Sequence, residues 1–131
     1  MGVPDVGGTW SSQDSNAIAG MYTEDGVRHV IAGDVVCRGR AEIIANVQGL
    51  IDVLDGEKVE VRKVSEGSDG TVTVEWVLLG THVKDAPGWP AKNESLHLLG
   101  VSVCDMAGDL IAEERVYWDA ATLLAGAGVL G

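Results

Sequence analysis

The second half of the chain alternates between apolar and polar residues with a period of two, which is the pattern of β-strands that bury one face. The predicted strands of this half span residues 58–66, 71–83, 93–104 and 110–118. The turn at 68–70 contains Asp-Gly, a strong hairpin signal, and the turn at 106–109 also contains a glycine. The pattern therefore predicts two antiparallel hairpins, and the Pro- and Gly-rich loop at 85–90 is expected to form a rim between them.

The first half shows helical periodicity over residues 40–54, where the apolar side chains recur on one stripe. Gly56 is expected to end this helix. The other predicted elements are a helix at 17–22 capped by Asp14-Ser15-Asn16, a strand at 27–32 and a helix at 120–125. Because helices come first and antiparallel strands follow, we expect an α+β domain with its helices packed on one face of a curved sheet.

Strand alternation also predicts which side chains face the interior. On the strand at 110–118 the even-numbered face is apolar apart from Glu114. An ionised carboxylate in apolar surroundings is costly, so it shifts its pKa, finds a partner or borders a water-filled cavity. Glu114 is therefore a candidate site residue. The alternative, left open by the residues alone, is a twist or bulge that turns Glu114 to solvent beside Glu113.

His29 is the second candidate, because Val27, His29 and Ile31 share one side of the strand at 27–32. The alternative is a core histidine whose ring nitrogens are satisfied by hydrogen bonds. The chain also contains four tryptophans and no phenylalanine. Buried indole N–H groups need acceptors, and either a core or a ligand pocket supplies them.

Length and charge restrict the classes of partner. With 131 residues the chain has room for one domain, predicted over residues 1–131. Acidic residues outnumber basic residues by 20 to 9, the net charge is −11, and no Lys/Arg cluster interrupts this acidity. Nucleic acids and anionic membranes are therefore not expected partners.

Cys37 and Cys104 lack the spacing of a disulfide scaffold, so we expect reduced, buried thiols. No segment has the composition of a signal peptide or a membrane-spanning helix, which favours a cytoplasmic protein. The histidines lack the spacing of metal ligands, and the alternation of the strand at 93–104 predicts that His97 points to the outer face of the sheet. The glycines form no nucleotide-binding motif, so neither a metal nor a cofactor is expected.

Several short stretches, spread from about residue 9 to the C-terminus, occur in a specific order and spacing. They are Trp10, Asp14, Ala17-Ile18-Ala19, Tyr22 to Val27, His29, Arg38-Gly39-Arg40, Val74-Glu75-Trp76, Gly80-Thr81-His82, Gly100 to Val103, Glu114 to Asp119 and Leu123-Leu124. Together they resemble the SnoaL-like polyketide cyclase family of the NTF2-like superfamily. The resemblance implies a cone, in which a curved antiparallel sheet with helices on its concave face encloses a pocket for a small apolar or aromatic ligand. It also implies a homodimer formed on the outer face of the sheet.

Acidic residues that the family uses in its chemistry are missing from this sequence. In the family's cyclases and in related epoxide hydrolases, an aspartate of the last strand aligns with Val116. The Arg and Asp of the hydrolases align near Leu78 and Gly80, so the hydrolase mechanism is not expected. His29 aligns with a position where family members carry a polar residue that binds substrate or water. Glu114 lies one inward step before the missing aspartate.

Two functions of different classes follow. The first is a cofactor-independent cyclase or isomerase of a polyketide-like or other polycyclic carbonyl compound, with His29 and Glu114 as acid and base in either order. The second is a non-catalytic binding or accessory dimer module, which the missing acids favour. The predicted ligand contacts are Trp10, Tyr22, Trp76, Leu78, His82, Leu98, Val116 and Trp118. A buried acid in a ligand-sized pocket favours the enzyme.

Overall fold

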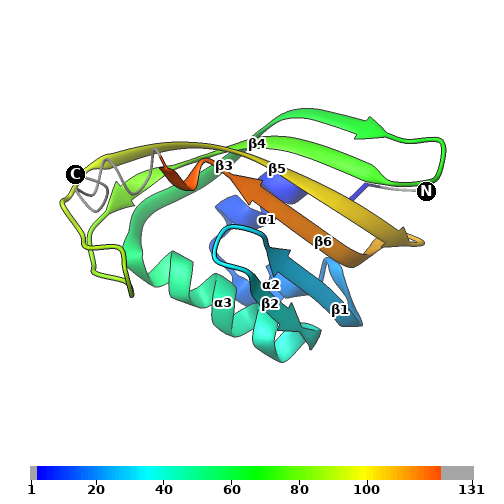
Figure 1. Ribbon diagram of the computed structural model, residues 1–131, viewed down its shortest axis with the longest axis horizontal. Helices are drawn as coiled ribbons and strands as arrows, with labels where there is room; N and C mark the ends of the chain where they lie inside the picture. The colour runs from blue at the N-terminus through cyan, green and yellow to red at the C-terminus, as the bar shows by residue number, and fades with distance from the viewer. Residues whose placement is uncertain (1–2, 122–131) are drawn as a thin grey trace.

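The computed structural model describes residues 3–121. Within this range the helices are α1 (Val6–Ser11), α2 (Ser15–Ala19) and α3 (Gly39–Val53). The strands are β1 (Tyr22–Val30), β2 (Val35–Arg38), β3 (Leu54–Glu66), β4 (Val72–His82), β5 (Ser95–Ala107) and β6 (Leu110–Trp118). The strands form one curved, unclosed sheet in the order β2-β1-β6-β5-β4-β3, and the helices lie on its concave side (Figure 1). The predicted α+β cone is confirmed.

The sheet joins segments from opposite ends of the sequence. β1 pairs with β2 in antiparallel fashion and with β6 in parallel, whereas β3, β4, β5 and β6 pair with one another as antiparallel neighbours. In the parallel pair Arg28 lies directly opposite Glu114. The fold therefore places a cation of the first strand beside the acid that the sequence singles out.

The long helix agrees with its prediction, since α3 differs from the predicted range of 40–54 by one residue at each end. Its buried stripe includes Ile43, Val47 and Ile51, all of which belong to the hydrophobic core. Gly56 does not end this helix, because the chain passes directly into β3 at Leu54. Gly56 instead has a φ of +64° at a bulge in β3, a conformation that glycine adopts without strain.

The N-terminal segment differs more from its prediction. Asp14 caps α2 as expected, its side chain accepting from two backbone N–H groups, but the helix ends at Ala19. β1 begins at Tyr22, five residues before the predicted strand at 27–32. Two short elements, α1 and β2, were not predicted. Gly7 and Gly8 within α1 are poor helix formers, and the helix is stabilised instead by the Asp5 cap and the burial of Trp10.

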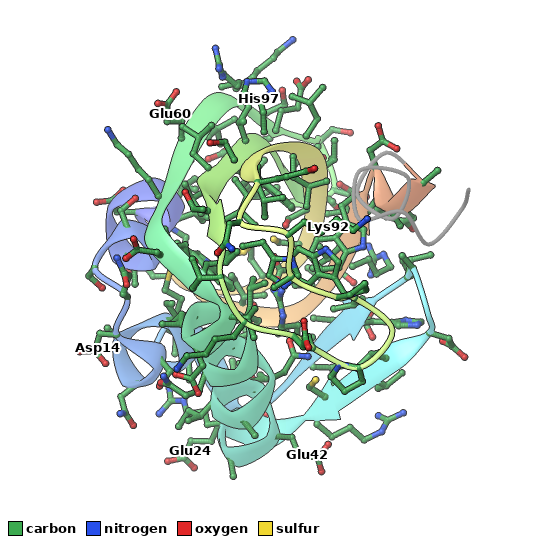
Figure 2. All side chains as sticks on the ribbon, turned by 90° about the vertical axis from the view of Figure 1, so that its left-hand side faces the viewer. Asp14, Glu24, Glu42, Glu60, Lys92 and His97 are labelled. Carbon is green, nitrogen blue, oxygen red and sulfur yellow. The ribbon has the colours of Figure 1, made fainter. Side chains whose placement is uncertain are left out.

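Strand faces follow the predicted alternation over most of β4 and β6. The exceptions are Val77, which is buried on the odd-numbered face of β4, and the start of β6, where Leu110 is exposed and Ile111 is buried. Val72, Val74, Trp76, Leu78 and His82 are buried, as are Glu114 and Val116. Figure 2 shows His97 and Glu60 at the outer edge of the molecule, pointing away from its interior, so the outward orientation predicted for His97 is confirmed. The helix predicted at 120–125 lies mostly outside the described residues. None of the described helices is long and apolar enough to cross a membrane.

Candidate functional site

A cavity lies between the concave face of the sheet and the helices, with about 370 Å³ of empty space including its open mouth. Its wall is formed by Val6, Trp10, Arg28, Leu50, Val59, Trp76, Leu78, Ser102, Glu114 and Trp118. Most of these side chains are aliphatic or aromatic. Arg28, Ser102 and Glu114 are the polar exceptions, so they are the residues that can form a hydrogen bond or ion pair with a polar group of a ligand.

Glu114 on β6 is held at one of its two carboxylate oxygens. Arg28 Nη1 donates to Glu114 Oε1 over 2.9 Å, and the Tyr22 hydroxyl donates to the same oxygen. All three side chains are buried, and Glu114 is only 5% exposed. Within residues 3–121 no hydrogen bond involves Oε2 of Glu114. This second oxygen is therefore the one available to a ligand.

Arg28 is itself fixed by contacts from two helices. Its Nε donates to Oδ1 of Asn46 on α3 over 3.1 Å, and its guanidinium carbon lies 5.2 Å from the ring centroid of Trp10 on α1, a cation–π geometry. Burial alone would lower the pKa of Arg28, but Tyr22 and Glu114 outweigh it and raise the pKa. Arg28 is therefore a permanent cation beside Glu114.

Tyr22 keeps its proton in this site. Burial raises the pKa of the phenol well above its ordinary value of 10.0, and the negative charge of Glu114 raises it further. A protonated hydroxyl can donate to Glu114 at every pH at which the protein is handled. Tyr22 and Arg28 thus act together as donors that hold the carboxylate in one orientation.

Ser102 on β5 faces the same cavity beside Trp76 on β4. Trp76 Nε1 donates to Ser102 Oγ over 3.0 Å, so the serine hydroxyl retains its own proton for another acceptor. The Trp76 ring lies against Gly100, where a Cβ atom would come within 2.3 Å of the ring, so glycine is required there. Glu114 pairs with Cys104, two residues from Ser102, which puts Ser102 and Glu114 about 7–8 Å apart at Cα.

Several predicted contact residues meet at this cavity and others do not. Trp10, Trp76, Leu78 and Trp118 line it together with Glu114. Tyr22 is buried next to it and bonded to Glu114. Leu98 and Val116 are buried in the core but are not among the lining residues. His82 is buried elsewhere on β4, with its ring stacked on Trp89 at 3.6 Å between centroids.

The orientation predicted for His29 is wrong. Its side chain is 30% exposed, and its Nε2 lies 2.7 Å from Oδ1 of the exposed Asp34. The inward positions of β1 belong to Arg28 and Val30, because aliphatic residues occur on both faces of this strand and the pattern does not separate them. Arg28 can be buried because Glu114 neutralises it. His29 therefore does not face the cavity, and Arg28 takes its place.

Arg28 and Ser102 are the polar site residues that the sequence analysis missed, and Val6, Leu50 and Val59 are the apolar ones. No sequence spacing connects Arg28 with Glu114, since their strands become neighbours only in the folded sheet. Ser102 shares its buried parity with Leu98, Gly100 and Cys104, and this parity was the one available signal. A small hydroxyl residue on such a face is usually a packing residue. The hydrogen bond between Ser102 and Trp76 is therefore apparent only in the structure.

The two cysteines are free and buried, as predicted. Burial raises the pKa of Cys104 to about 12, and the negative charge of Glu114 contributes to the rise. A thiol with this pKa stays protonated at neutral pH, so Cys104 is a packing residue opposite Glu114 and not a nucleophile.

The chain was compared with known proteins, and the comparison identifies its family. None of the curated proteins matches the chain. A protein from Catenulispora acidiphila with a ketosteroid isomerase-like fold, solved in complex with trimethylamine, has a TM-score of 0.79 at 21% identity over 97% of this chain and 95% of its own. A candidate polyketide cyclase from Pseudomonas putida has a TM-score of 0.79 at 18% identity, covering 90% of this chain and 89% of its own.

A third similar structure is SalBIII, an epoxide hydrolase/cyclase-like enzyme of pyran ring formation in the polyether salinomycin. Its TM-score is 0.70 at 23% identity, covering 86% of this chain and 83% of its own. These likenesses establish the fold. The family model described as SnoaL-like polyketide cyclase matches residues 7–126, which is nearly the whole sequence. The chain therefore belongs to the SnoaL-like polyketide cyclase family.

Proposed function

We propose that this protein is a cofactor-independent cyclase or isomerase that acts by general acid/base chemistry on a polyketide-like or other polycyclic carbonyl compound. The observation that carries the proposal is the buried carboxylate of Glu114 in a mostly apolar cavity, held at Oε1 and with no partner for Oε2 among residues 3–121. A buried acid with one unoccupied oxygen in such a cavity is typical of an active site. Family membership and the cyclase and isomerase names among similar structures support the same class of reaction.

Glu114 is the proposed base. Its ion pair with Arg28 requires the carboxylate form, which is the form that accepts a proton. In the proposed reaction Oε2 removes a proton from the carbon next to the substrate carbonyl, and the electron pair of that C–H bond forms the enolate. Arg28 and Tyr22 are positioning residues, because both donate to Oε1 and leave Oε2 without a donor among the described residues.

Ser102 is the proposed donor to the carbonyl oxygen. Its hydroxyl accepts from Trp76 Nε1 and therefore directs its proton elsewhere, toward the developing enolate oxygen. The estimated separation of Ser102 and Glu114, about 7–8 Å between Cα atoms, leaves room for a carbonyl group and its neighbouring carbon between their side chains. This assignment replaces His29, which faces Asp34.

Proton abstraction can be tested before the natural substrate is identified. The probe is α-tetralone, a bicyclic aromatic ketone, in D2O, with exchange of its α-protons followed by NMR. The wild-type protein is expected to accelerate exchange, and Glu114→Gln is expected to lose about 100-fold or more of that rate. Ser102→Ala is expected to lose less, because binding and the base remain.

Glu113→Gln is the matched control, since Glu113 is the preceding residue and its carboxylate accepts from the partly exposed Arg115. A folded Glu114→Gln protein with wild-type exchange and turnover would contradict the proposal. If wild type and Glu114→Gln both bind ketones and neither promotes exchange, the protein is a binding or accessory module, in agreement with the missing aspartate at Val116.

We further expect the homodimer that the resemblance implies. Leu99 on β5 and Tyr117 on β6 are large hydrophobic residues with 57% and 44% exposure. Both have the outward parity of their strands, and Val101, which pairs with Tyr117, lies between them. An exposed apolar patch of this kind is typical of a surface that a second subunit covers.

A further inference from the structure

A second buried acid lies on the same side of the sheet, apart from the Glu114 site. Glu57 on β3 is 3% exposed, and neither of its carboxylate oxygens has a hydrogen-bond partner within the described residues. The residue sits in the bulge at Gly56, and its backbone oxygen accepts from Gln13 Nε2 over 3.4 Å. A buried carboxyl group with no partner is destabilising, so a fold that keeps one calls for an explanation.

His82 on the neighbouring strand has the same property. It is 3% exposed, and its Nε2 atom is buried without a hydrogen-bond partner in the described part of the chain. One face of its ring is covered by Trp89 from the loop between β4 and β5. Nε2 of His82 is therefore a second buried polar atom without a partner in the part of the chain that the structure describes.

The strand register brings these two residues together. His82 pairs with Leu54 and Leu79 pairs with Lys58, so the bulge that contains Glu57 lies opposite Gly80, two residues from His82. Diagonal neighbours of this kind are about 7–8 Å apart at Cα, within reach of long side chains. Gly80 adds no side chain between them, and a Cβ atom there would lie 3.4 Å from Glu57 Cα.

The pair adjoins the main cavity. The next inward residues along the two strands are Val59 and Leu78, which pair with each other and line the cavity wall. We propose that Glu57 and His82 form a second polar subsite, which binds a hydroxyl group of the ligand at a distance from Glu114. Trp89, which covers His82, is the side chain that must move to admit it.

The chemistry of the two groups matches a hydroxyl. Burial raises the pKa of Glu57 to about 7, so a protonated carboxyl is available near neutral pH to donate to the hydroxyl oxygen. Nε2 of His82, in the tautomer that leaves it unprotonated, accepts the hydroxyl proton. A hydroxyl is both donor and acceptor, so one group can bind both side chains. The inference rests on the ligand-binding part of the proposed function and not on its chemistry.

The test compares α-tetralone with its derivatives that carry one hydroxyl at each position of the aromatic ring. Dissociation constants are measured by calorimetry, without turnover. At least one hydroxylated probe is expected to bind wild type about tenfold more tightly than α-tetralone. Glu57→Met and His82→Phe are expected to reduce this preference to about twofold or less, while α-tetralone binds as before. His82→Phe keeps an aromatic ring against Trp89.

Glu66→Gln is the control, because it neutralises an exposed acid of the same strand and is expected to keep the preference. A second readout is the melting temperature, which Glu57→Met is expected to raise by a few degrees, since it removes an unpartnered buried carboxyl. The inference is overturned if no hydroxylated probe binds wild type better than α-tetralone, if the preference survives Glu57→Met, or if Glu57→Met lowers the melting temperature. Loss of proton exchange in Glu114→Gln is independent of all three results.

Discussion

Two glutamates face the interior of this protein, and the fold treats them in opposite ways. Glu114 and Glu57 are 5% and 3% exposed, so burial does not distinguish them. Glu114 has a cation and a phenol at one oxygen, whereas Glu57 has no side-chain partner in the described residues. The difference shows that two acids buried to the same depth can have opposite surroundings, one with a counter-charge and one without.

The contrast arises from the residue that lies opposite each glutamate on the neighbouring strand. β6 lies beside β1, where register places Arg28 opposite Glu114. β3 is the edge strand next to β4, where the bulge places Glu57 opposite a glycine. A charge partner is available in the first pair and absent in the second. Single substitutions at Arg28, Glu57 and Tyr22 are expected to distinguish the two environments.

Replacing Arg28 is expected to have the largest effect. Arg28→Met leaves Glu114 as a buried acid without its cation, and removing one partner of a buried pair costs about 3–5 kcal/mol in the free energy of unfolding. Urea denaturation at neutral pH measures this loss. Arg115→Met is the control, because Arg115 pairs with exposed Asp105 and Glu113, and exposed pairs contribute about 1 kcal/mol or less. Equal losses in the two variants would show that Glu114 is satisfied without Arg28.

Glu57 is expected to make stability fall as pH rises. Its pKa is raised from 4.5 to about 7 in the folded protein, so the unfolded chain ionises first and the folded state loses stability between these two values. At 1.36 kcal/mol per pKa unit the loss is at most about 3 kcal/mol. Denaturation at pH 5 and pH 8 should therefore show Glu57→Gln gaining stability relative to wild type at the higher pH. A difference independent of pH would mean that Glu57 is solvated in the folded state.

The smallest effect is expected at Tyr22. Tyr22→Phe removes one donor from Glu114 but leaves Arg28 in place, so the free energy of unfolding should fall by about 1.5 kcal/mol, as for a hydrogen bond to a charged group. Tyr117→Phe on the outer face provides the matched control. A loss as large as that of Arg28→Met would show that the phenol, and not the cation, keeps the carboxylate buried.

Much of the fold could be predicted from the sequence because local patterns control it. The helix at 40–54 and the strands at 71–83 and 110–118 agree closely with α3, β4 and β6, since each has a strong apolar periodicity. The parity of β6 also identified Glu114 as the inward acid. Short elements such as α1 and β2 could not be predicted, because tertiary contacts stabilise them more than propensity does.

The candidate site was only partly predictable for a related reason. Trp10, Trp76, Leu78 and Trp118 were identified by parity or composition and do line the cavity. Arg28 was missed because a charged residue on a strand with apolar residues on both faces looks exposed until its partner is known. In the sequence, Glu57 falls between the predicted helix at 40–54 and the predicted strand at 58–66, so no face was assigned to it. The bulge of β3 that turns Glu57 inward has no sequence signal beyond Gly56.

The parallel pairing of β1 with β6 also constrains how the chain can fold. β6 is inserted between β1 and β5, and the ion pair that it completes joins residues 86 positions apart in sequence. Without β6 the sheet consists of two separate parts with unpaired edges, one formed by β1 and β2 and the other by β3, β4 and β5. Arg28 then lacks the counter-charge that allows it to be buried. During synthesis the cone therefore closes only after the last described strand has been made. Completion of the sheet therefore depends on the same strand that carries Glu114, the proposed catalytic base.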